Sequence, residues 1–408
     1  MNNSSLIAKL QRTVSSTLQS LRLPLTSELV IDLGTANTRI YAPGRGVVLD
    51  EPSVIALSAS TDQVVAAGRV AKQMIGREPA SIRVVRPLRD GVIADFVAAE
   101  KMLSTFMRRA LTQLTILSPR VLVSTPGEIT QVEQRAVEEA AYRAGARQVE
   151  FIEEPFAAAA GVGIDTEAAH ASAVVDIGAG TVDIAVLSLG GLIHASTLRT
   201  GGMAMDYALA RYLREEHSLE VGEETAERIK RMLGLVEPYQ SNRAIEAGGQ
   251  SLLTRLPARI KVTSAEVQTA VEPVVAEIMR AVIASLEKLP PEVSADLLDS
   301  GLVLTGGGAQ LPGLSERLCQ ETGLEVRLST NPTLAVVLGA ARLLWPETAA
   351  PELKLVPESS TSSTTTEPDG AKIRPGAEKI AEPISQSTPT AVPAIRMVKR
   401  SASSLRVH

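Results

Sequence analysis

The chain is poor in the residue types that build several common kinds of functional site. Aromatic residues make up only 2% of its 408 residues, which argues against a platform that stacks nucleic-acid bases. One cysteine, Cys319, and four histidines are too few for a disulfide, a thiolate metal cluster or a zinc site. Cys319 follows Leu318 in an apparent helix, so we expect it to fill the core.

Long apolar runs and a large charge imbalance are also absent. No run approaches the roughly 20 residues of a membrane-spanning helix, and no signal-peptide pattern is present. The net charge of −5 and pI near 5.7 imply no general affinity for nucleic acid. These absences predict a cytoplasmic protein without nucleic-acid partners.

Three regions differ in composition. Residues 1–27 contain no acidic residue and carry an apolar helical stripe. Residues 28 to about 348 alternate strand-like and helix-like segments, which is typical of an α/β protein. Residues 349–408 are rich in Ser, Thr, Pro and Glu and cannot bury enough apolar surface to fold alone, so we expect a disordered tail.

Eight elements of the middle region can be predicted from apolar periodicity. The expected strands are Leu29–Leu33, Arg120–Ser124, Glu150–Glu153 and Ala173–Ile177. The expected helices are Val97–Leu111, Gln131–Ala144, Ala204–Glu216 and Ala265–Leu286.

The strongest signal is a segment that occurs twice. Residues 30–38 (VIDLGTANT) recur as residues 174–182 (VVDIGAGTV), which predicts two matching hairpins, one in each of two lobes. Small turn residues allow backbone N–H groups to approach phosphate oxygens: Gly34, Thr35, Ala36 and Asn37, and Gly178, Ala179 and Gly180. Asp32 and Asp176 are then placed to hold Mg²⁺, through water. The alternative is two ordinary hairpins with glycine turns.

A third cluster of glycines follows the apolar run Leu302–Leu304. Gly306, Gly307, Gly308 and Ala309 lead into a helix, and their bare backbone suits the adenosine side of a nucleotide site. A plain strand–helix turn is the alternative. Neither a Walker loop nor a Rossmann fingerprint occurs in the chain.

These motifs, in this order, resemble the actin and DnaK-type ATPase superfamily, and within it the MreB family of bacterial actins. Further MreB-like stretches are residues 50–54 (DEPSV), 86–96 (RPLRDGVIADF), 119–123 (PRVLV), 152–155 (IEEP), 225–230 (TAERIK) and 303–308 (VLTGGG). The resemblance covers about residues 28–345.

The resemblance implies a duplicated actin-like fold with two lobes and an ATP cleft between them. It divides the chain into a first-lobe core of 28–55, 98–168 and 331–348, a small subdomain of 56–97, a second-lobe core of 169–204 and 263–330, and a small subdomain of 205–262. An amphipathic segment, 1–27, precedes these parts, and the tail of 349–408 follows them.

The resemblance also implies roles for residues at the start of a helix and in the second hairpin. Glu154 would orient or activate the attacking water, and Thr181 would help to position it. Taken alone, Glu154 could simply be a first-turn carboxylate that favours a helix N-terminus. Glu153 is expected to point elsewhere and has no assigned role.

Glu227 and Lys230 are expected to contact ribose and adenine by the same resemblance. Their spacing alone indicates a common helix face and would also fit a surface ion pair. Three departures from the usual MreB pattern are Ala179 for glycine, Val182-Asp183 for Thr-Glu, and Met203 for aspartate.

Two apolar segments are candidates for membrane attachment. Leu6, Ile7 and Leu10 belong to the helical stripe of Ser4–Leu23, whose only charges are basic, and this suits an anionic headgroup layer. Leu114, Ile116 and Leu117 stand where MreB-like proteins carry a membrane loop. Packing against the protein's own body would explain either segment without a membrane. Residues 395–400 are basic and partly apolar, so they could dock a partner or lipid, but solvated disorder is the favoured explanation.

The function implied by the resemblance is a slow, Mg²⁺-dependent ATPase that polymerises on the inner face of the cell membrane. The expected partners are further copies of the chain, in paired protofilaments, and cell-wall elongation proteins. Alternatives are an organelle-aligning filament, a DnaK-type chaperone, a sugar or acetate kinase, and a non-polymerising adaptor. A chaperone needs a further folded domain, and a kinase needs an additional base and pocket that we do not recognise in the sequence.

Overall fold

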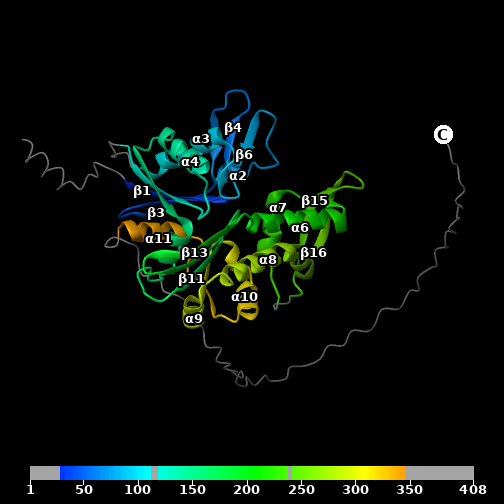
Figure 1. The fold of residues 1–408 in the computed structure, drawn as a ribbon. Helices are drawn as coiled ribbons and strands as arrows, with labels where there is room; N and C mark the ends of the chain where they lie inside the picture. The colour runs from blue at the N-terminus through cyan, green and yellow to red at the C-terminus, as the bar shows by residue number, and fades with distance from the viewer. Residues whose placement is uncertain (1–27, 112–117, 238–240, 346–408) are drawn as a thin grey trace, which may run out of the picture. The chain divides into compact units, whose positions relative to one another are not determined.

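Two five-stranded sheets with the same strand order organise the structure, a computed structural model that describes residues 28–111, 118–237 and 241–345 (Figure 1). The first sheet has the order β10-β9-β1-β2-β3, formed by Gln148–Glu153, Arg120–Thr125, Glu28–Leu33, Asn37–Ala42 and Gly46–Pro52. The second has the order β18-β17-β11-β12-β13, formed by Val326–Leu328, Leu302–Thr305, Ser172–Ile177, Val182–Ser188 and Gly191–Leu198.

The two sheets also share their strand directions. In each, a central strand pairs antiparallel with the next strand of its hairpin and parallel with a strand that arrives later in the chain. Asp32 and Asp176 occupy equivalent places near the ends of the central strands β1 and β11. The duplicated α/β architecture expected from the repeated segment is therefore present in the topology.

The central strands are buried because helices cover the sheets. Their Val- and Ile-rich sequences lack the alternation of a half-exposed strand, as expected for strands covered on both faces. The helices are α3 (Phe96–Ala110), α4 (Gln131–Arg143), α5 (Glu154–Gly161), α6 (Gly202–His217), α7 (Glu223–Leu233), α8 (Ser264–Leu286), α9 (Pro291–Ser300), α10 (Leu314–Thr322) and α11 (Ala335–Leu344), with a short α2 (Arg69–Lys72) and a 3₁₀ turn η1 (Gly308–Gln310).

Helices α5 and α11 pack against each other and share one hydrophobic core with the central strands of both sheets. Their close approach depends on Gly161 and Gly339. A Cβ atom at Gly161 would overlap the carbonyl oxygen of Ala335, and one at Gly339 would overlap that of Ala157. The two helices therefore lie close together. The core that they share with Val174, Ala185 and Val303 of the second sheet connects the lobes.

Smaller sheets extend each lobe. In the first lobe, β5 (Val64–Ala67), β4 (Ile55–Ser58) and β6 (Ile82–Val85) form one sheet, and β7 (Leu88–Arg89) with β8 (Val92–Ile93) forms a short hairpin. In the second lobe, the small sheet contains β14 (Leu219–Glu220), β15 (Ala244–Ser251) and β16 (Pro257–Thr263).

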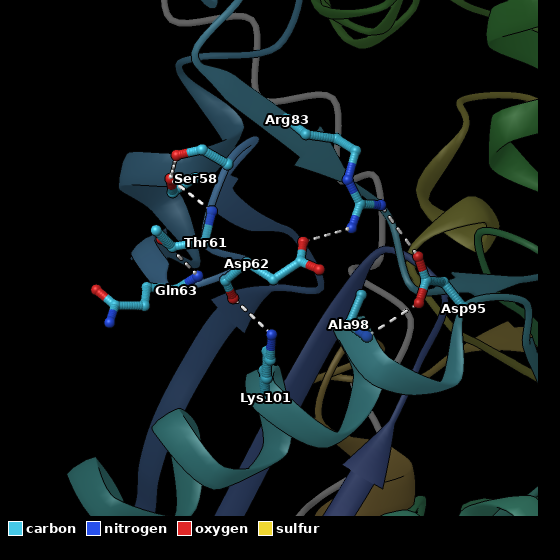
Figure 2. A network of polar contacts seen from close by, with 9 residues as sticks. Ser58, Thr61, Asp62, Gln63, Arg83, Asp95, Ala98 and Lys101 are labelled. Atoms are coloured by element: carbon cyan, nitrogen blue, oxygen red, sulfur yellow. Dashed lines mark hydrogen bonds and ion pairs between the residues drawn. The ribbon is translucent and has the colours of Figure 1, made fainter.

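A polar network fixes the start of α3 to the small first-lobe sheet (Figure 2). Arg83 on β6 lies 3.3 Å from carboxylate oxygens of both Asp62 and Asp95. Asp95 is also the N-cap of α3, because its side chain accepts from the N–H of Ala98 at 3.0 Å. Lys101 donates to the carbonyl of Asp62 at 2.5 Å. The network therefore connects β6 with the start of α3, and the β7–β8 hairpin lies between these two elements in the chain.

All eight predicted elements are confirmed, with ends that differ by at most two residues. The prediction for Cys319 is wrong, because its side chain is exposed on α10 while neighbouring Leu318 is buried. Consecutive residues of a helix point about 100° apart. When only one face of a helix packs on the core, a residue next to a buried one can therefore be exposed.

Candidate functional site

The turns of the two repeated hairpins lie in direct contact. A Cβ atom at Gly180, in the second turn, would lie 2.5 Å from Oγ1 of Thr35 in the first turn. The second turn is closed by a hydrogen bond of 2.8 Å from the N–H of Gly178 to the carbonyl of Thr181. Two segments that are more than 140 residues apart in sequence therefore meet at one place.

The backbone carbonyls of each turn accept hydrogen bonds from neighbouring segments. In the first turn, the Ser53 hydroxyl donates to the carbonyl of Gly34 at 2.6 Å, and the Ser53 N–H donates to that of Ala36 at 2.8 Å. In the second turn, the N–H groups of Gly202 and Met203 donate to the carbonyls of Gly178 and Ala179, at 3.0 and 2.9 Å.

The amide groups of the turns are left for another acceptor. Within the described ranges, the N–H groups of Thr35, Ala36, Ala179 and Gly180 donate to no protein oxygen. The turn carbonyls accept hydrogen bonds from the protein, whereas the turn N–H groups have no protein acceptor. Successive free N–H groups of this kind form a favourable binding place for an anion. The arrangement fits the phosphate-binding role predicted for both hairpins.

A third turn, absent from our predicted site, also reaches this place. Asp90 and Gly91 link β7 to β8 and have φ of +49° and +80°, the backbone of a two-residue hairpin turn. The N–H of Gly91 donates to Oγ1 of Thr35 at 2.9 Å, and a Cβ at Gly91 would lie 2.8 Å from Cγ2 of Thr181. The Asp-Gly pair between Leu88-Arg89 and the apolar pair Val92-Ile93 was the signal for it.

Four acidic side chains gather beside the turns: Asp32, Glu154, Asp176 and Asp183. Desolvation by burial raises the pKa of Asp32 and of Asp183. Burial and then the charges of Asp183 and Asp32 raise the pKa of Asp176 to about 8. The same causes, with burial first, raise the pKa of Glu154 well above its usual range. The site is short of positive charge and would be stabilised by a cation.

These acids differ in how far the protein already engages them. Asp183 accepts from the hydroxyl of Thr197 at 2.6 Å and from the N–H of Gly127 at 3.3 Å. Asp32 accepts from the Ser124 hydroxyl at 3.4 Å. Asp183, which we noted only as a departure from the family pattern, is therefore buried beside the turns and lies in the same cluster.

The acidic cluster fits a hydrated metal ion better than a direct protein cage. Among the residues that the structure describes, no three His, Cys, Asp or Glu side chains form a metal-binding group. Mg²⁺ usually keeps several waters and shares one or two carboxylates with substrate phosphates. Asp32 and Asp176, at matching places in the two lobes, fit that mode of binding.

Glu154 and Glu153 lie differently although they are neighbours. Glu153 is exposed and is the N-cap residue of α5, whereas Glu154 is the first helical residue and half-buried. Glu154 is near enough to Asp183, Asp32 and Asp176 for their charges to raise its pKa. The helix therefore directs the second acid of the pair toward the cluster.

The glycine segment after β17 packs closely against the second hairpin. Side chains at Gly306 and Gly308 would overlap atoms of Asp176 and Ile177, and Gly306 has φ of +86°. Gly307 faces open space, with no atom closer than 3.9 Å to its Cβ position. Ala309 is buried in the second-lobe core. Gly307 is exposed and Gly308 is partly exposed, so these two glycines offer the bare backbone that our adenosine interpretation requires, whereas Gly306 and Ala309 are buried.

Glu227 and Lys230, on one face of α7, have separate protein partners. Lys230 forms an ion pair of 2.8 Å with buried Asp206 and donates to the carbonyl of Gly202 at 2.5 Å. Glu227 forms an ion pair of 2.5 Å with Lys72 of the first lobe. Lys230 therefore lies beside Gly202, which supports the second turn, and Glu227 lies against the first lobe. A ligand that contacts either residue would have to share it with an ion-pair partner.

Three ion pairs connect α7 to the first lobe, and we call them the α7 ion pairs. They are Lys72–Glu227 at 2.5 Å, Arg77–Glu224 at 2.6 Å and Arg86–Glu223 at 2.6 Å. Each has its basic member in the first lobe and its acidic member on α7. They bring the outer parts of the two lobes together at a place separate from the α5–α11 contact.

The expected membrane contacts lie outside the described residues. This applies to Leu6, Ile7 and Leu10 of residues 1–27 and to Leu114, Ile116 and Leu117 of residues 112–117. Within the described ranges, no helix is both long and apolar enough to cross a membrane.

Comparison with known sequences connects this geometry to one family. The family described as "MreB/Mbl protein" matches residues 26–350. The cell shape-determining protein MreB of Escherichia coli K12 is 44% identical over 332 residues, which are 80% of this chain and 96% of that protein. The cell shape-determining protein Mbl of Bacillus subtilis is 41% identical over 328 residues, covering 80% and 98%.

Solved structures show the same fold. MreB5 of Spiroplasma citri bound to AMPPNP superposes with a TM-score of 0.74 at 31% identity, over 79% of this chain and 96% of that chain. A MamK double helical filament gives a TM-score of 0.66 at 23% identity, over 78% and 98%. The two lobes therefore have the actin-like fold.

Proposed function

This chain belongs to the MreB/Mbl family of actin-like proteins, and from that membership we propose that it is a cytoskeletal ATPase that helps to set cell shape. Its filaments would form with ATP, associate with the inner face of the cytoplasmic membrane, and organise cell-wall elongation proteins. The observation that carries the proposal is the contact between the two hairpin turns, which brings N–H groups without a protein acceptor together from both lobes.

The nucleotide phosphates occupy that place in our proposal. The free amides of Thr35 and Ala36 in the first turn and of Ala179 and Gly180 in the second hold phosphate oxygens from the two lobes. Asp32 and Asp176 hold hydrated Mg²⁺, which supplies charge neutralisation to the phosphates when it is bound. Gly307 offers a side-chain-free surface to the adenosine, and Glu227 and Lys230 lie near the sugar. The AMPPNP bound to the related MreB5 supports this assignment.

Hydrolysis requires a water molecule that is oriented toward the terminal phosphate. We assign this role to Glu154, because it is the half-buried acid at the start of α5 and lies near Asp183, Asp32 and Asp176, whose charges, after burial, raise its pKa. Thr181, whose methyl group lies against the Gly91 position, would hold the same water through its hydroxyl. We expect slow turnover in the single subunit, because sites of this type are commonly completed by a neighbouring subunit.

Self-assembly and ATP hydrolysis can be tested together by sedimentation and phosphate release. We expect the protein to pellet with ATP and to release phosphate slowly. Glu154→Gln should bind ATP normally and release phosphate at least ~10-fold more slowly, since it cannot accept a proton. Glu153→Gln is the matched control, because the exposed neighbour should leave release unchanged.

Two results would contradict the proposal separately. Normal phosphate release by Glu154→Gln would remove Glu154 from hydrolysis but leave assembly intact. Failure of the wild-type protein to pellet with ATP, alone or on anionic liposomes, would reject the filament. The membrane part rests on the apolar residues of 1–27 and 112–117, so deletion of residues 1–27 should weaken liposome binding.

A further inference from the structure

Arg39 on β2 lies between two aspartates on the neighbouring strands. The strand register places it directly opposite Asp32 on β1 and Asp50 on β3. Its Nη1 lies 3.1 Å from Oδ2 of Asp32, and its Nε lies 3.3 Å from Oδ1 of Asp50. The arginine side chain is only 13% exposed, so its charge is placed inside the site.

The charge of Arg39 acts on both candidate metal-binding acids. Burial raises the pKa of Asp32 and Asp176, and in both cases the charge of Arg39 opposes that rise. Four acidic groups share this small buried volume, so one guanidinium compensates only part of their charge. A cation that arrives with the nucleotide would complete the compensation.

The two aspartates offer Arg39 different surroundings. Asp32 is 8% exposed and lies in the acidic cluster, whereas Asp50 is 51% exposed and lies at the outer side of the sheet. Within the described ranges the Nε of Arg39 makes no hydrogen bond, although it lies at ion-pair distance from Asp50. A small movement of the guanidinium toward Asp50 would therefore free Asp32 and satisfy this donor.

We propose that Arg39 is a positioning residue that acts as an internal counter-ion of the phosphate site. It pairs with Asp32 when no metal is present and keeps its pair with Asp50 when a divalent cation takes over Asp32. This inference rests on the proposed nucleotide site. Its consequence is that Arg39 supports nucleotide binding without metal and thereby reduces the dependence of nucleotide affinity on Mg²⁺.

Arg120 provides a matched control in the same sheet. It also joins two acids, at 3.2 Å from Glu28 and 2.9 Å from Glu150, but it stands at the opposite end of the central strand. Replacing either arginine removes a cross-strand ion-pair network from the first-lobe sheet. Only Arg39 lies beside the acidic cluster, so only its replacement should change the response to metal.

The experiment measures the affinity of the full chain for a fluorescent ATP analogue in excess Mg²⁺ and in EDTA. The quantity of interest is the ratio of the Kd in EDTA to the Kd in Mg²⁺. A unit charge several ångströms from a phosphate in a partly screened site changes affinity by roughly 10-fold or more. Arg39→Leu should therefore raise the ratio about 10-fold, while Arg39→Lys and Arg120→Leu should keep the wild-type ratio.

Arg39→Gln removes the charge but keeps a polar side chain. If Arg39→Leu does not fold, the ratio of the two Kd values is measured with Arg39→Gln instead. An unchanged ratio in the uncharged variants, together with lower thermal stability only, would show that Arg39 merely stabilises the sheet and would overturn the inference. In that case nucleotide binding by the wild-type protein would still support the proposed function. No binding by the wild-type protein under either condition would reject both.

Discussion

The α7 ion pairs should hold the lobes closed over a bound nucleotide, and their removal should speed its release. The change to make is Glu223→Gln with Glu227→Gln, which removes the charge from two of the three pairs and keeps the size of both side chains. Both acids contact the first lobe, through Arg86 and Lys72 respectively. Opening the lobes requires these contacts to break.

The expected size of the effect follows from the exposure of the pairs. The side chains of Lys72–Glu227 are both 27% exposed, and those of Arg86–Glu223 are 18% and 25% exposed. At this partial exposure each pair contributes about 1 kcal/mol, at the upper end of the range for surface pairs. The third pair, Arg77–Glu224, is 62% and 44% exposed and should contribute less. Loss of about 2 kcal/mol corresponds to a roughly 30-fold faster release.

The assay is stopped-flow displacement of a fluorescent ADP by excess unlabelled nucleotide. Release from the wild-type protein should also accelerate with salt, because screening weakens pairs that are not fully buried. Glu220→Gln is the matched control, since its ion pair with Arg214 lies wholly within the second lobe. The charge-swapped variant Glu223→Arg with Arg86→Glu restores a pair that has no assigned nucleotide contact, so it should release ADP at the wild-type rate. Equal release rates in the wild-type and Glu223/Glu227 variants would refute the reasoning.

Two further predictions concern stability and the turn contact. The nucleotide-free protein in EDTA should lose thermal stability as pH rises from 5.5 to 8, because native Asp176, with its pKa raised to about 8, keeps a proton that the unfolded chain has released. Asp176→Asn should flatten this dependence in a thermal-shift assay, and a wild-type Tm that rises over the same range with no change in the variant would contradict the assignment. Gly180→Ala should weaken nucleotide binding by at least ~10-fold in a fluorescence titration, because its Cβ would lie 2.5 Å from Oγ1 of Thr35 and force the turns apart. Gly222→Ala, at an open position with φ of −76°, should bind normally; equal affinity in both variants would mean that the turn contact is unimportant.

The parts of the fold that the sequence predicts best are those set by local pattern. Continuous Val and Ile runs mark the central strands, and capping boxes at Thr130 and Thr263 begin α4 and α8 where the apolar periodicity starts. The repeated Asp-apolar-Gly segment predicted the two matching hairpins because the same local sequence forms the same turn twice. For the same reason Asp32 and Asp176 could be placed at equivalent strand ends.

The features that sequence reasoning missed depend on distant partners. Asp183 enters the acidic cluster through burial beside the other lobe, and the Asp90–Gly91 turn reaches Thr35 only once the first-lobe sheet has folded. The contact between Arg39 and Asp50 depends on the register of β2 with β3. Spacing along α7 showed that Glu227 and Lys230 share a face, but it carried no information about the basic residues of the other lobe.

The central claim is that both hairpin turns bind the phosphates of one nucleotide, and hydrogen exchange measured by mass spectrometry tests it most directly. On addition of Mg²⁺ and AMPPNP, peptides covering residues 34–37 and 178–181 should gain protection together, because their free N–H groups would then donate to phosphate oxygens. Protection of only one turn, or of neither turn while the nucleotide is bound, would contradict the account.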